Sequence, residues 1–187
     1  EIKEFVDQFE LFPGTRFMGS KNKIIYELWH YLEEIEFESF LDVFAGSNVV
    51  SYFMKTKGKK VITNDFMAIS YFASKALIEN TSTIISESDL VLLLETPSKE
   101  SFISDTFKDL YFTDEENQFL DQIRANIDLL ENEFKKSLAI SALTRACMKK
   151  RPRGIFTFIG HRYDDGRKDI RKSLKDHFID NIYNFNN

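Results

Sequence analysis

A loop of small residues around Gly46 is the first place where this sequence could hold a ligand. The stretch Phe40–Val50 reads as a buried strand that passes through this loop directly into a helix. Such a junction lets a ligand approach the backbone, and the helix N-terminus adds unpaired N–H groups. A dinucleotide fingerprint uses three glycines to seat a pyrophosphate, but Gly46 stands alone, with Asn48 where the next glycine would fall. The loop therefore favours a nucleoside-containing ligand without a pyrophosphate, although a turn of small residues is about as often purely structural.

Two charged residues extend this candidate site. Asp65 ends the second apolar stretch, 19 positions after Gly46, where a carboxylate can accept hydrogen bonds from both hydroxyls of a ribose. The alternative is that Asp65 only caps the helix that follows it. Lys21 stands at the start of an expected helix, where an ammonium is unfavourable unless an anion such as a methionine carboxylate lies nearby; a solvated surface lysine is the alternative there. Together these residues predict S-adenosylmethionine as the ligand.

A strand–helix–strand unit is expected to position these residues. Its strands are predicted at residues 39–43 and 60–64, and a helix of apolar periodicity lies between them. The first strand is apolar apart from Asp42, which predicts a parallel strand that is covered on both faces. Two further amphipathic helices are predicted around this unit, at residues 20–36, with Ser20 as the N-cap, and at residues 66–79.

The character of the sequence changes after about residue 80. No strand alternation follows, and three-four spacing of apolar residues predicts helices at residues 89–94, 114–130 and 133–149. Thr113 and Glu116 form a capping-box pattern at the start of the second of these helices. The sequence therefore predicts an α/β protein, with a Rossmann-like cofactor-binding part at residues 1–80 and a mainly helical region at residues 81–187.

Composition excludes several classes of protein. The 187 residues are 43% apolar, and 19 Phe stand against 7 Gly and 3 Pro, which argues against disorder and against a turn-rich all-β fold. Cys147 is the single cysteine, so neither an intrachain disulfide nor a cysteine-based zinc site is possible, and a reducing, cytoplasmic setting is expected. The sequence shows no secretion signal and no uninterrupted apolar run of about 18 residues, so no membrane insertion is expected. It also contains no metal-ligand spacing, triphosphate loop or nucleophile elbow.

Positive charge gathers late in an acidic chain. The net charge is −5, yet a basic segment with interleaved aromatic residues begins near residue 145. Cations can hold phosphates and aromatic rings can stack on bases, so this segment is a candidate nucleic-acid interface. The alternative is a helix C-terminus that is basic for dipole reasons, followed by a solvated loop. The candidate DNA-binding residues are Lys149, Lys150, Arg151, Arg153, His161, Arg162 and Arg167.

Three segments in this order resemble the N-terminal half of D12-class, Dam-like adenine-N6 DNA methyltransferases, enzymes of restriction–modification. They are residues 16–21 (Arg-Phe-Met-Gly-Ser-Lys), 41–47 (Leu-Asp-Val-Phe-Ala-Gly-Ser) and 63–65 (Thr-Asn-Asp). The resemblance continues to residue 124 and implies a Rossmann-like S-adenosylmethionine-dependent methyltransferase fold acting on double-stranded DNA. Asn48 departs from the family pattern, which has glycine there. The cofactor-binding residues that the resemblance implies are Phe17, Gly19, Ser20, Lys21, Asp42, Phe44, Ala45, Gly46, Asn48, Asp65 and Phe66.

One motif of the family is absent from these 187 residues. The family methylates an exocyclic amine with a D/N-P-P-Y/F tetrapeptide that holds the amine while its aromatic residue stacks on a flipped-out base. The three prolines, Pro13, Pro97 and Pro152, are never adjacent, so no catalytic residue of this kind is assigned. By the motif order of the family, the recognition region lies between the cofactor half and this tetrapeptide, and the chain stops at Asn187, about where the latter half would begin. We therefore expect an N-terminal fragment or one subunit of a split enzyme; the start at Glu1 rather than Met suggests a processed piece. The remainder of the chain, or a second chain, would then carry the tetrapeptide, and this chain alone would be inactive.

Two other functions remain open at this point. The first is a non-catalytic module, a degenerate methyltransferase domain that binds DNA or a protein partner. It predicts DNA binding that weakens with salt, without cofactor binding. The second is a methyltransferase that acts on RNA or on protein.

Overall fold

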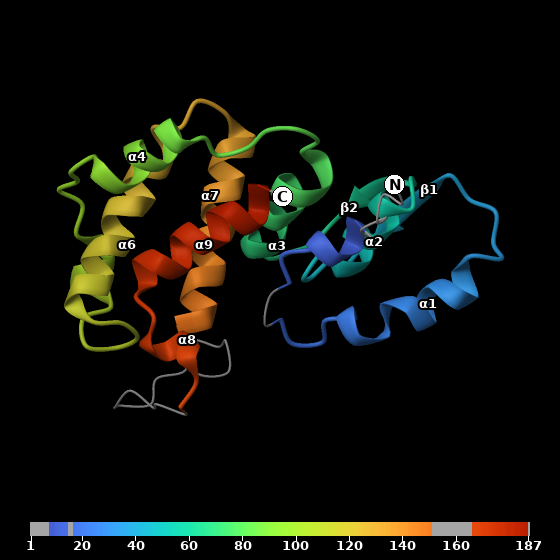
Figure 1. Ribbon diagram of the computed structural model, residues 1–187, viewed down its shortest axis with the longest axis horizontal. Helices are drawn as coiled ribbons and strands as arrows, with labels where there is room; N and C mark the ends of the chain where they lie inside the picture. The colour runs from blue at the N-terminus through green and yellow to red at the C-terminus, as the bar shows by residue number, and fades with distance from the viewer. Residues whose placement is uncertain (1–7, 15–16, 151–165, 187) are drawn as a thin grey trace, which may run out of the picture. The chain divides into compact units, whose positions relative to one another are not determined.

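The computed structural model describes residues 8–14, 17–150 and 166–186 of the chain. These residues form two compact units, one up to Thr81 and one from Ser82 to Asn186 (Figure 1). Each unit is built around its own buried side chains.

The first unit contains a short parallel sheet and its helices. β1 and β2 pair in parallel, with Ser39 opposite Lys60 and Asp42 opposite Thr63. α2 connects the two strands, which confirms the predicted strand–helix–strand unit. The elements of this unit are η1 (Gln8–Leu11), η2 (Asn22–Ile24), α1 (Ile25–Leu32), β1 (Ser39–Asp42), α2 (Val49–Thr56), β2 (Lys60–Thr63), α3 (Ala68–Ser74) and the π-helical turn η3 (Lys75–Glu79).

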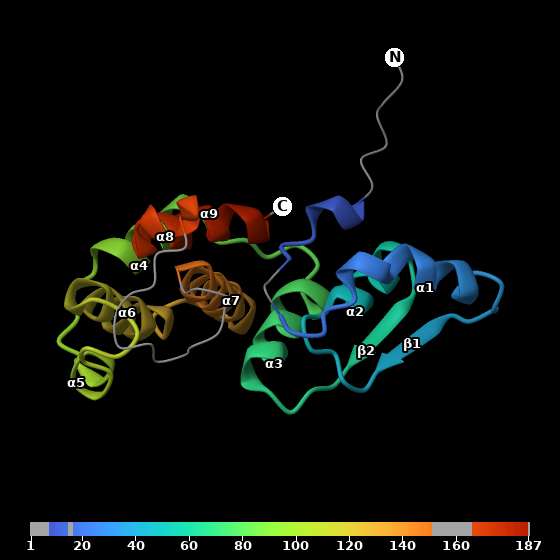
Figure 2. The ribbon, with the colours of Figure 1, turned by 90° about the horizontal axis from the view of Figure 1, so that it is seen from below.

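Only one face of this sheet is covered by the described residues. Figure 2 shows α1 and α2 on the same side of the two strands. Exposure alternates along both strands, and Leu41 and Ile62, which point away from these helices, are 59% and 52% exposed. The prediction that the first strand is covered on both faces was therefore wrong for the described chain. An apolar strand sequence indicates that both faces of the strand favour burial. It does not say whether residues of the same chain cover both faces.

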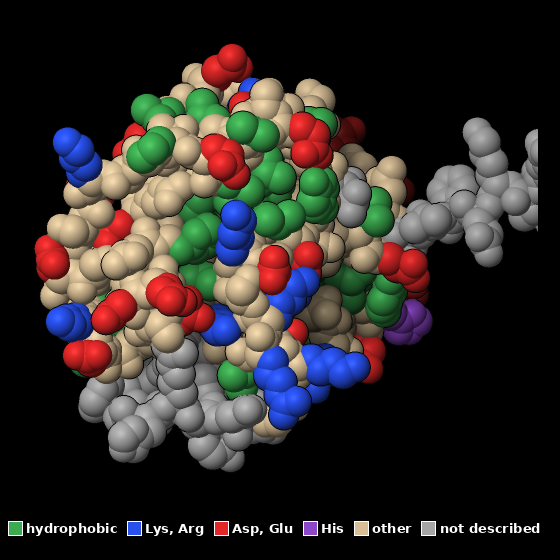
Figure 3. Space-filling model, turned by 60° about the vertical axis from the view of Figure 1, so that its left-hand side comes forward, with side chains coloured by type: hydrophobic (Ala, Val, Ile, Leu, Met, Phe, Trp, Pro, Cys, Tyr) green, Lys and Arg blue, Asp and Glu red, His purple; other side chains and the backbone are tan. Residues whose placement is uncertain are grey.

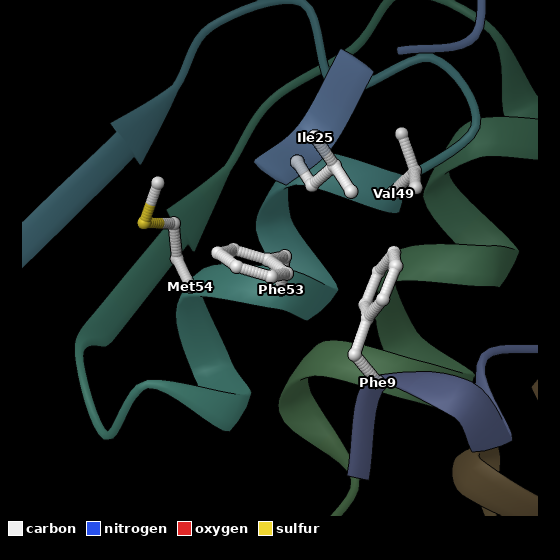
Figure 4. Close-up of a cluster of buried hydrophobic side chains, with 5 residues drawn as sticks. All are labelled: Phe9, Ile25, Val49, Phe53 and Met54. Atoms are coloured by element: carbon white, nitrogen blue, oxygen red, sulfur yellow. The ribbon is translucent and has the colours of Figure 1, made fainter. Parts of the chain in front are cut away.

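The covered face packs on an aromatic core. Phe9, Ile25, Val49, Phe53 and Met54 are buried together, from η1, α1 and α2 (Figure 4). The Phe53 ring lies edge-on to the Phe9 ring, with centroids 5.1 Å apart, an arrangement that adds to the burial of both rings. α2 is thereby fixed against the sheet, and its N-terminus against the loop that follows β1.

Two predicted helices of this unit are shorter than their periodicity suggests. α1 ends at Leu32 rather than near residue 36, where several acidic residues would face the negative end of the helix dipole. Its start also differs from the prediction: Ser20 is not an N-cap, and a 3₁₀ turn precedes Ile25. α3 begins at Ala68 with Met67 as its N-cap, because Asp65 holds the backbone just before it.

The second unit is entirely helical in its described residues. The capping box at Thr113 and Glu116 is present as predicted, with both reciprocal hydrogen bonds formed. α7 packs along α9, and Leu138 of α7 and Phe178 of α9 are fully buried. The helices are α4 (Glu87–Glu95), α5 (Phe102–Thr106), α6 (Asp114–Ile127), α7 (Glu133–Lys150), α8 (Lys168–Arg171) and α9 (Leu174–Asn186).

Side chains of α6 close the ends of two other helices. Asp121 accepts hydrogen bonds from the N–H groups of Ile103 and Ser104 at the start of α5. The amide of Asn126 donates to the carbonyls of Leu93 and Thr96 at the end of α4. Helix ends leave such groups unpaired, so these buried polar side chains hold the unit together.

Within the described ranges, no helix is long and apolar enough to cross a membrane. Asp and Glu side chains share a face of the molecule with Lys and Arg side chains (Figure 3). The net charge of −5 therefore coexists with local positive surface.

Candidate functional site

The loop between β1 and α2 has a backbone conformation that few residue types tolerate. Gly46 has a φ of 51° and Asn48 a φ of 62°, both in the left-handed region. A side chain at Gly46 would also lie within 3.2 Å of the Phe17 ring. The backbone conformation and the approach of Phe17 therefore both favour glycine there. Asn48 occupies the second left-handed position because asparagine tolerates this region better than most residues with a side chain.

Asp65 fastens this loop to the end of β2. Its Oδ2 accepts a hydrogen bond from the N–H of Gly46 at 2.8 Å, and its Oδ1 accepts one from the N–H of Met67 at 2.8 Å. The Met67 N–H lowers the pKa of this carboxyl below its usual value; partial burial opposes the shift, and the Gly46 N–H adds to it. The Phe66 N–H lowers this pKa as well, so Asp65 is an oriented, ionised carboxylate.

The segment before η2 reaches the same loop. The hydroxyl of Ser47 donates to the hydroxyl oxygen of Ser20 at 3.2 Å, across 27 residues of sequence. Gly19 turns the chain here with a φ of 77°. Lys21 is exposed, its ammonium donates to the Gly19 carbonyl at 3.2 Å, and among the described residues no carboxylate pairs with it. Its charge therefore stays available to an anionic group.

Two aromatic rings stand open to solvent beside these polar groups. Phe44 is 86% exposed at the start of the loop, and Phe66, which follows Asp65, is fully exposed. Large exposed rings at the carboxyl ends of neighbouring strands are unusual unless something covers them. The flat faces of these rings suit a purine base, and the adjacent carboxylate suits the hydroxyls of its sugar.

Two of the predicted cofactor residues have structural partners inside the unit. Asp42 accepts a hydrogen bond from the Ser51 hydroxyl at 2.7 Å, which ties the end of β1 to α2. Ala45 is buried, and its N–H donates to the Asn64 carbonyl at 3.0 Å, which continues the strand pairing into the loop. These two residues shape the loop through contacts within the protein.

The side chain of Asn48 has a connection that sequence reasoning missed. Its Nδ2 donates to the Ser70 carbonyl at 3.1 Å, and its Oδ1 accepts from the Ser74 hydroxyl at 2.6 Å. Asn48 is fully buried, so α3 is joined to the loop through its interior. The available signal was the i,i+4 spacing of Ser70 and Ser74 on an otherwise apolar helix.

The predicted DNA-binding residues fall into two groups. Arg151, Arg153, His161 and Arg162 lie outside the described residues, whereas Lys149, Lys150 and Arg167 lie within them. The Lys150 ammonium donates to the carbonyls of Ile170 and Lys172 at 2.9 and 2.7 Å and pairs with Glu116 at 3.2 Å. Lys150 thus joins α7 to α6 and α8 through two hydrogen bonds and an ion pair.

Lys149 lies one residue earlier on α7, near Arg145 and Lys172 but also near the acids Asp169 and Asp180, which favour its charged form. Burial lowers the pKa of its ammonium, and the charge of Arg145, one turn back, lowers it further. The Nε and Nη1 atoms of Arg145 are buried without a hydrogen-bond partner in the described chain. An incompletely paired guanidinium is costly in a folded protein, so this end of α7 favours an anionic ligand.

The described residues contain no group of three or more His, Cys, Asp or Glu side chains that could hold a metal ion. Cys147 is buried, and burial together with the charge of Glu116 raises the pKa of its thiol to about 12. A thiol held in its neutral form does not act as a nucleophile near neutral pH.

Comparison with known proteins agrees with the resemblance in the sequence. The family described as D12 class N6 adenine-specific DNA methyltransferase matches residues 17–186. The type II methyltransferase M2.HphI of Haemophilus parahaemolyticus is 30% identical over 188 residues, which cover 94% of this chain and 56% of that protein. The type II methyltransferase M.NlaIII of Neisseria lactamica is 30% identical over 128 residues, 62% of this chain and 38% of that protein. The modification methylase StsI of Streptococcus sanguinis is 39% identical over 70 residues, 36% of this chain and 11% of its own.

The chain spans little more than half the length of M2.HphI and a smaller share of the other two proteins. No solved structure matches it significantly. The family match nevertheless includes the Gly46 loop, Asp65 and the helical unit, and the chain belongs to the D12 class of N6 adenine-specific DNA methyltransferases.

Proposed function

We propose that this chain carries the S-adenosylmethionine site and part of the DNA-recognition region of an adenine-N6 DNA methyltransferase. The observation that carries the proposal is the convergence of Phe17, Gly46 and Asp65. The Phe17 ring lies against the Gly46 backbone, and the Asp65 carboxylate accepts the Gly46 N–H. Three segments that are far apart in the sequence thus meet at the carboxyl end of a parallel strand pair, where open α/β sheets bind ligands.

The residues of this site fit the chemical parts of S-adenosylmethionine. The Asp65 carboxylate can accept hydrogen bonds from the ribose hydroxyls, and the exposed rings of Phe44 and Phe66 can cover the adenine. Lys21, which no acid of the described chain pairs with, can face the methionine carboxylate. When bound, this cofactor supplies an electrophilic methyl group. The chain's own part is to orient the donor and to keep the loop in one conformation.

The methyl acceptor requires groups that this chain does not contain. We propose that the D/N-P-P-Y/F tetrapeptide lies in the remainder of the enzyme or in a second chain, and that this polypeptide covers the open face of the sheet. Leu41 and Ile62 expose apolar side chains on that face, while parallel sheets are almost always buried on both faces. β1 and β2 would then be part of a larger, Rossmann-like sheet.

Isothermal titration calorimetry of the 187-residue chain with S-adenosylmethionine, and with its demethylated product, tests the cofactor site. We expect measurable heat with a one-to-one stoichiometry. Asp65→Ala should weaken binding at least tenfold, because it removes the charge-assisted acceptors of the ribose. Asp128→Ala removes an exposed acid at the C-cap of α6 in the helical unit and should leave the affinity unchanged.

Two outcomes of this titration contradict the proposal. Absence of heat in the wild-type chain would exclude a preformed cofactor site and would favour the non-catalytic module. An Asp65→Ala chain that stays folded and binds as tightly as the wild type would remove Asp65 from the site. Circular dichroism of each variant separates loss of binding from loss of folding.

For the helical unit we propose contact with the DNA backbone near the end of α7. Lys149 and Arg145 supply the support: their charges lie close enough to depress the pKa of Lys149, and Arg145 lacks partners in the described chain. Lys150 is engaged within the unit and should contribute to folding more than to binding.

Fluorescence anisotropy of a labelled duplex, measured between about 50 and 200 mM salt, tests this contact. Lys149→Gln should weaken binding to all sequences and lower the slope of log K against log salt by about one. Lys99→Gln, at an exposed lysine of the same unit, should change neither quantity. Equal effects of Lys149→Gln and Lys99→Gln would show that DNA affinity depends on the net charge of the chain and not on a specific contact at the end of α7.

A further inference from the structure

We infer that Asn48 is a positioning residue. Its side chain joins the loop around Gly46, here called the cofactor loop, to α3, and so fixes the distance between this loop and α3. The inference rests on the proposed function, because it concerns the same site. Asn48 would affect cofactor binding through the hydrogen bonds of its side-chain amide to α3, and not through a contact with the cofactor.

The backbone at Asn48 has a conformation that glycine would adopt with less strain. A φ of 62° places this residue in the left-handed region, and it is also the N-cap of α2, where its side chain forms no capping bond. Glycine adopts such a conformation without strain and has no side chain to bury. Asn48 is instead fully buried, so its amide lies inside the unit, where both its donor and its acceptor need hydrogen-bond partners.

Both polar atoms of this amide are used on one helix. Nδ2 donates to the Ser70 carbonyl at 3.1 Å, and Oδ1 accepts from the Ser74 hydroxyl at 2.6 Å. Ser70 and Ser74 are buried on one face of α3, one helical turn apart. Because its two hydrogen bonds reach successive turns of α3, the amide restricts both sliding of α3 along its axis and movement of α3 away from the loop.

The connection reaches the ligand-facing groups from both sides. On the loop side, the Asn48 N–H donates to the Ala45 carbonyl at 2.7 Å, so the amide is rigidly joined to the turn that contains Gly46. On the helix side, α3 follows directly from Met67, whose N–H is held by Asp65. Asp65 in turn accepts the Gly46 N–H. Asn48 therefore closes a ring of contacts around the carboxylate that would bind the ribose.

A second polar connection joins the last turn of α2 to η3, which continues α3, and provides a matched control. The Lys55 ammonium, in the last turn of α2, donates to the carbonyls of Leu77 and Asn80 at 2.8 and 2.6 Å. It closes the end of the π-helical turn η3, away from Asp65 and the Gly46 loop. Both connections join α2 or its preceding loop to the helical segment 68–79 and its end, but only that of Asn48 touches the cofactor loop.

The test compares Ser74→Ala, Asn48→Gly and Lys55→Met in the 187-residue chain. Each variant is measured for S-adenosylmethionine affinity by calorimetry, for thermal stability, and for amide hydrogen exchange at residues 45–49. Ser74→Ala leaves the loop sequence intact and removes one donor from the Asn48 amide, so we expect affinity to fall roughly three- to tenfold. Asn48→Gly keeps the backbone conformation and should weaken binding at least as much.

The comparison separates positioning from stability. Lys55→Met should lower the melting temperature but leave the affinity within about twofold, and loop exchange should accelerate in Ser74→Ala but not in Lys55→Met. In the double variant Asn48→Gly/Ser74→Ala the two losses should not add, because both remove the same connection. Ser74→Thr, which restores a hydroxyl, should recover part of the affinity lost in Ser74→Ala.

Two results would overturn the inference. One is an unchanged affinity and unchanged loop exchange in Ser74→Ala; the other is an equal loss of affinity in Lys55→Met, which would make stability the cause. If the wild-type chain binds no cofactor, the proposed function fails, and the exchange rates still decide whether Asn48 orders the loop.

Discussion

The carboxylate of Asp65 has a structural role in the loop, and we propose that it binds the ribose as well. Two backbone N–H groups, from Met67 and Gly46, already donate to it. This orients the carboxylate before any ligand arrives and keeps it ionised, because hydrogen bonds to the charged form favour that form. The sequence offered two interpretations of Asp65, a helix cap and a ribose acceptor. The structure shows a third role, a clasp between the loop and β2, and that role is compatible with ribose binding.

The clasp predicts a specific dependence of stability on pH. The pKa of Asp65 is lower in the folded state than in the unfolded chain, so its contribution is fully present above the unfolded value, about 4, and is lost as pH falls through the folded value. Asp65→Asn cannot ionise. We therefore expect it to be less stable than the wild type at pH 6, with the difference in unfolding free energy shrinking below about pH 4.

Urea unfolding of both proteins at several pH values between 6 and 3 measures this difference. Parallel curves over that range would show that the charge of Asp65 does not stabilise the folded loop. If the stability of the wild type rose relative to that of the variant as pH falls, folding would raise the pKa of Asp65, which contradicts the prediction.

The strand pair shows how an element can be well formed and still incomplete. β1 and β2 are fixed by their register and by a core on one face that centres on Phe53. Their other face exposes Leu41 and Ile62. The exposed face contributes little to the stability of this chain as it stands, since area that remains in water yields no hydrophobic stabilisation.

Substitutions on the two faces should therefore differ strongly. Leu41→Ser and Ile62→Thr should each change the free energy of unfolding of this chain by less than about 0.5 kcal/mol. Phe53→Ala removes a side chain that is fully buried and should cost about 3–5 kcal/mol. Chemical denaturation of the three variants measures these values.

The same substitutions test the proposed covering polypeptide. In an enzyme completed by the remainder of the protein or by its partner, Leu41→Ser should become clearly destabilising, because the side chain would then be buried. If its cost stays near zero in the completed enzyme, something other than this face joins the two parts.

The whole chain consists of two units with separate cores. Helix-capping contacts of Asp121 and Asn126 stay within the helical unit, as does the packing of α7 on α9. The Asn48 and Lys55 connections stay within the first unit. Cofactor and DNA binding are proposed for different units, so variants of one function should leave the other measurable.

This division predicts that residues 82–186 fold without the first unit. Expressed alone, they should show the circular dichroism of a helical protein and a cooperative thermal transition, because their buried residues are packed mainly against one another. A broad, non-cooperative transition would mean that the helical unit depends on residues before Ser82. Thr113→Ala in the same fragment should lower its stability by about 1 kcal/mol through loss of the helix cap.

Much of the local structure could be predicted from the sequence. The strand–helix–strand unit, the capping box at Thr113 and the three-four spacing that buries Ile123 and Ile127 are local patterns, and local patterns fix element type. The predictions were wrong where the outcome depends on distant residues. Ser20 carries the signal of an N-cap, and its hydroxyl oxygen does accept the Asn22 N–H at 3.4 Å, but Lys21 is the N-cap of the 3₁₀ turn and the same oxygen also accepts the Ser47 hydroxyl, because the chain folds back there.

The candidate site divides in the same way. The sequence alone determined which residues could serve it, because Gly46 and Asp65 have fixed spacing and a chemistry that few residue types supply. It also determined the family, because three short motifs occur in order. Only the tertiary structure decided that Asp65 clasps Gly46, that Phe17 closes on the loop, and that the Asn48 amide joins α3. These contacts join residues that are at least 19 positions apart in the sequence. Their geometry depends on how the core positions each backbone segment, and no local pattern encodes that.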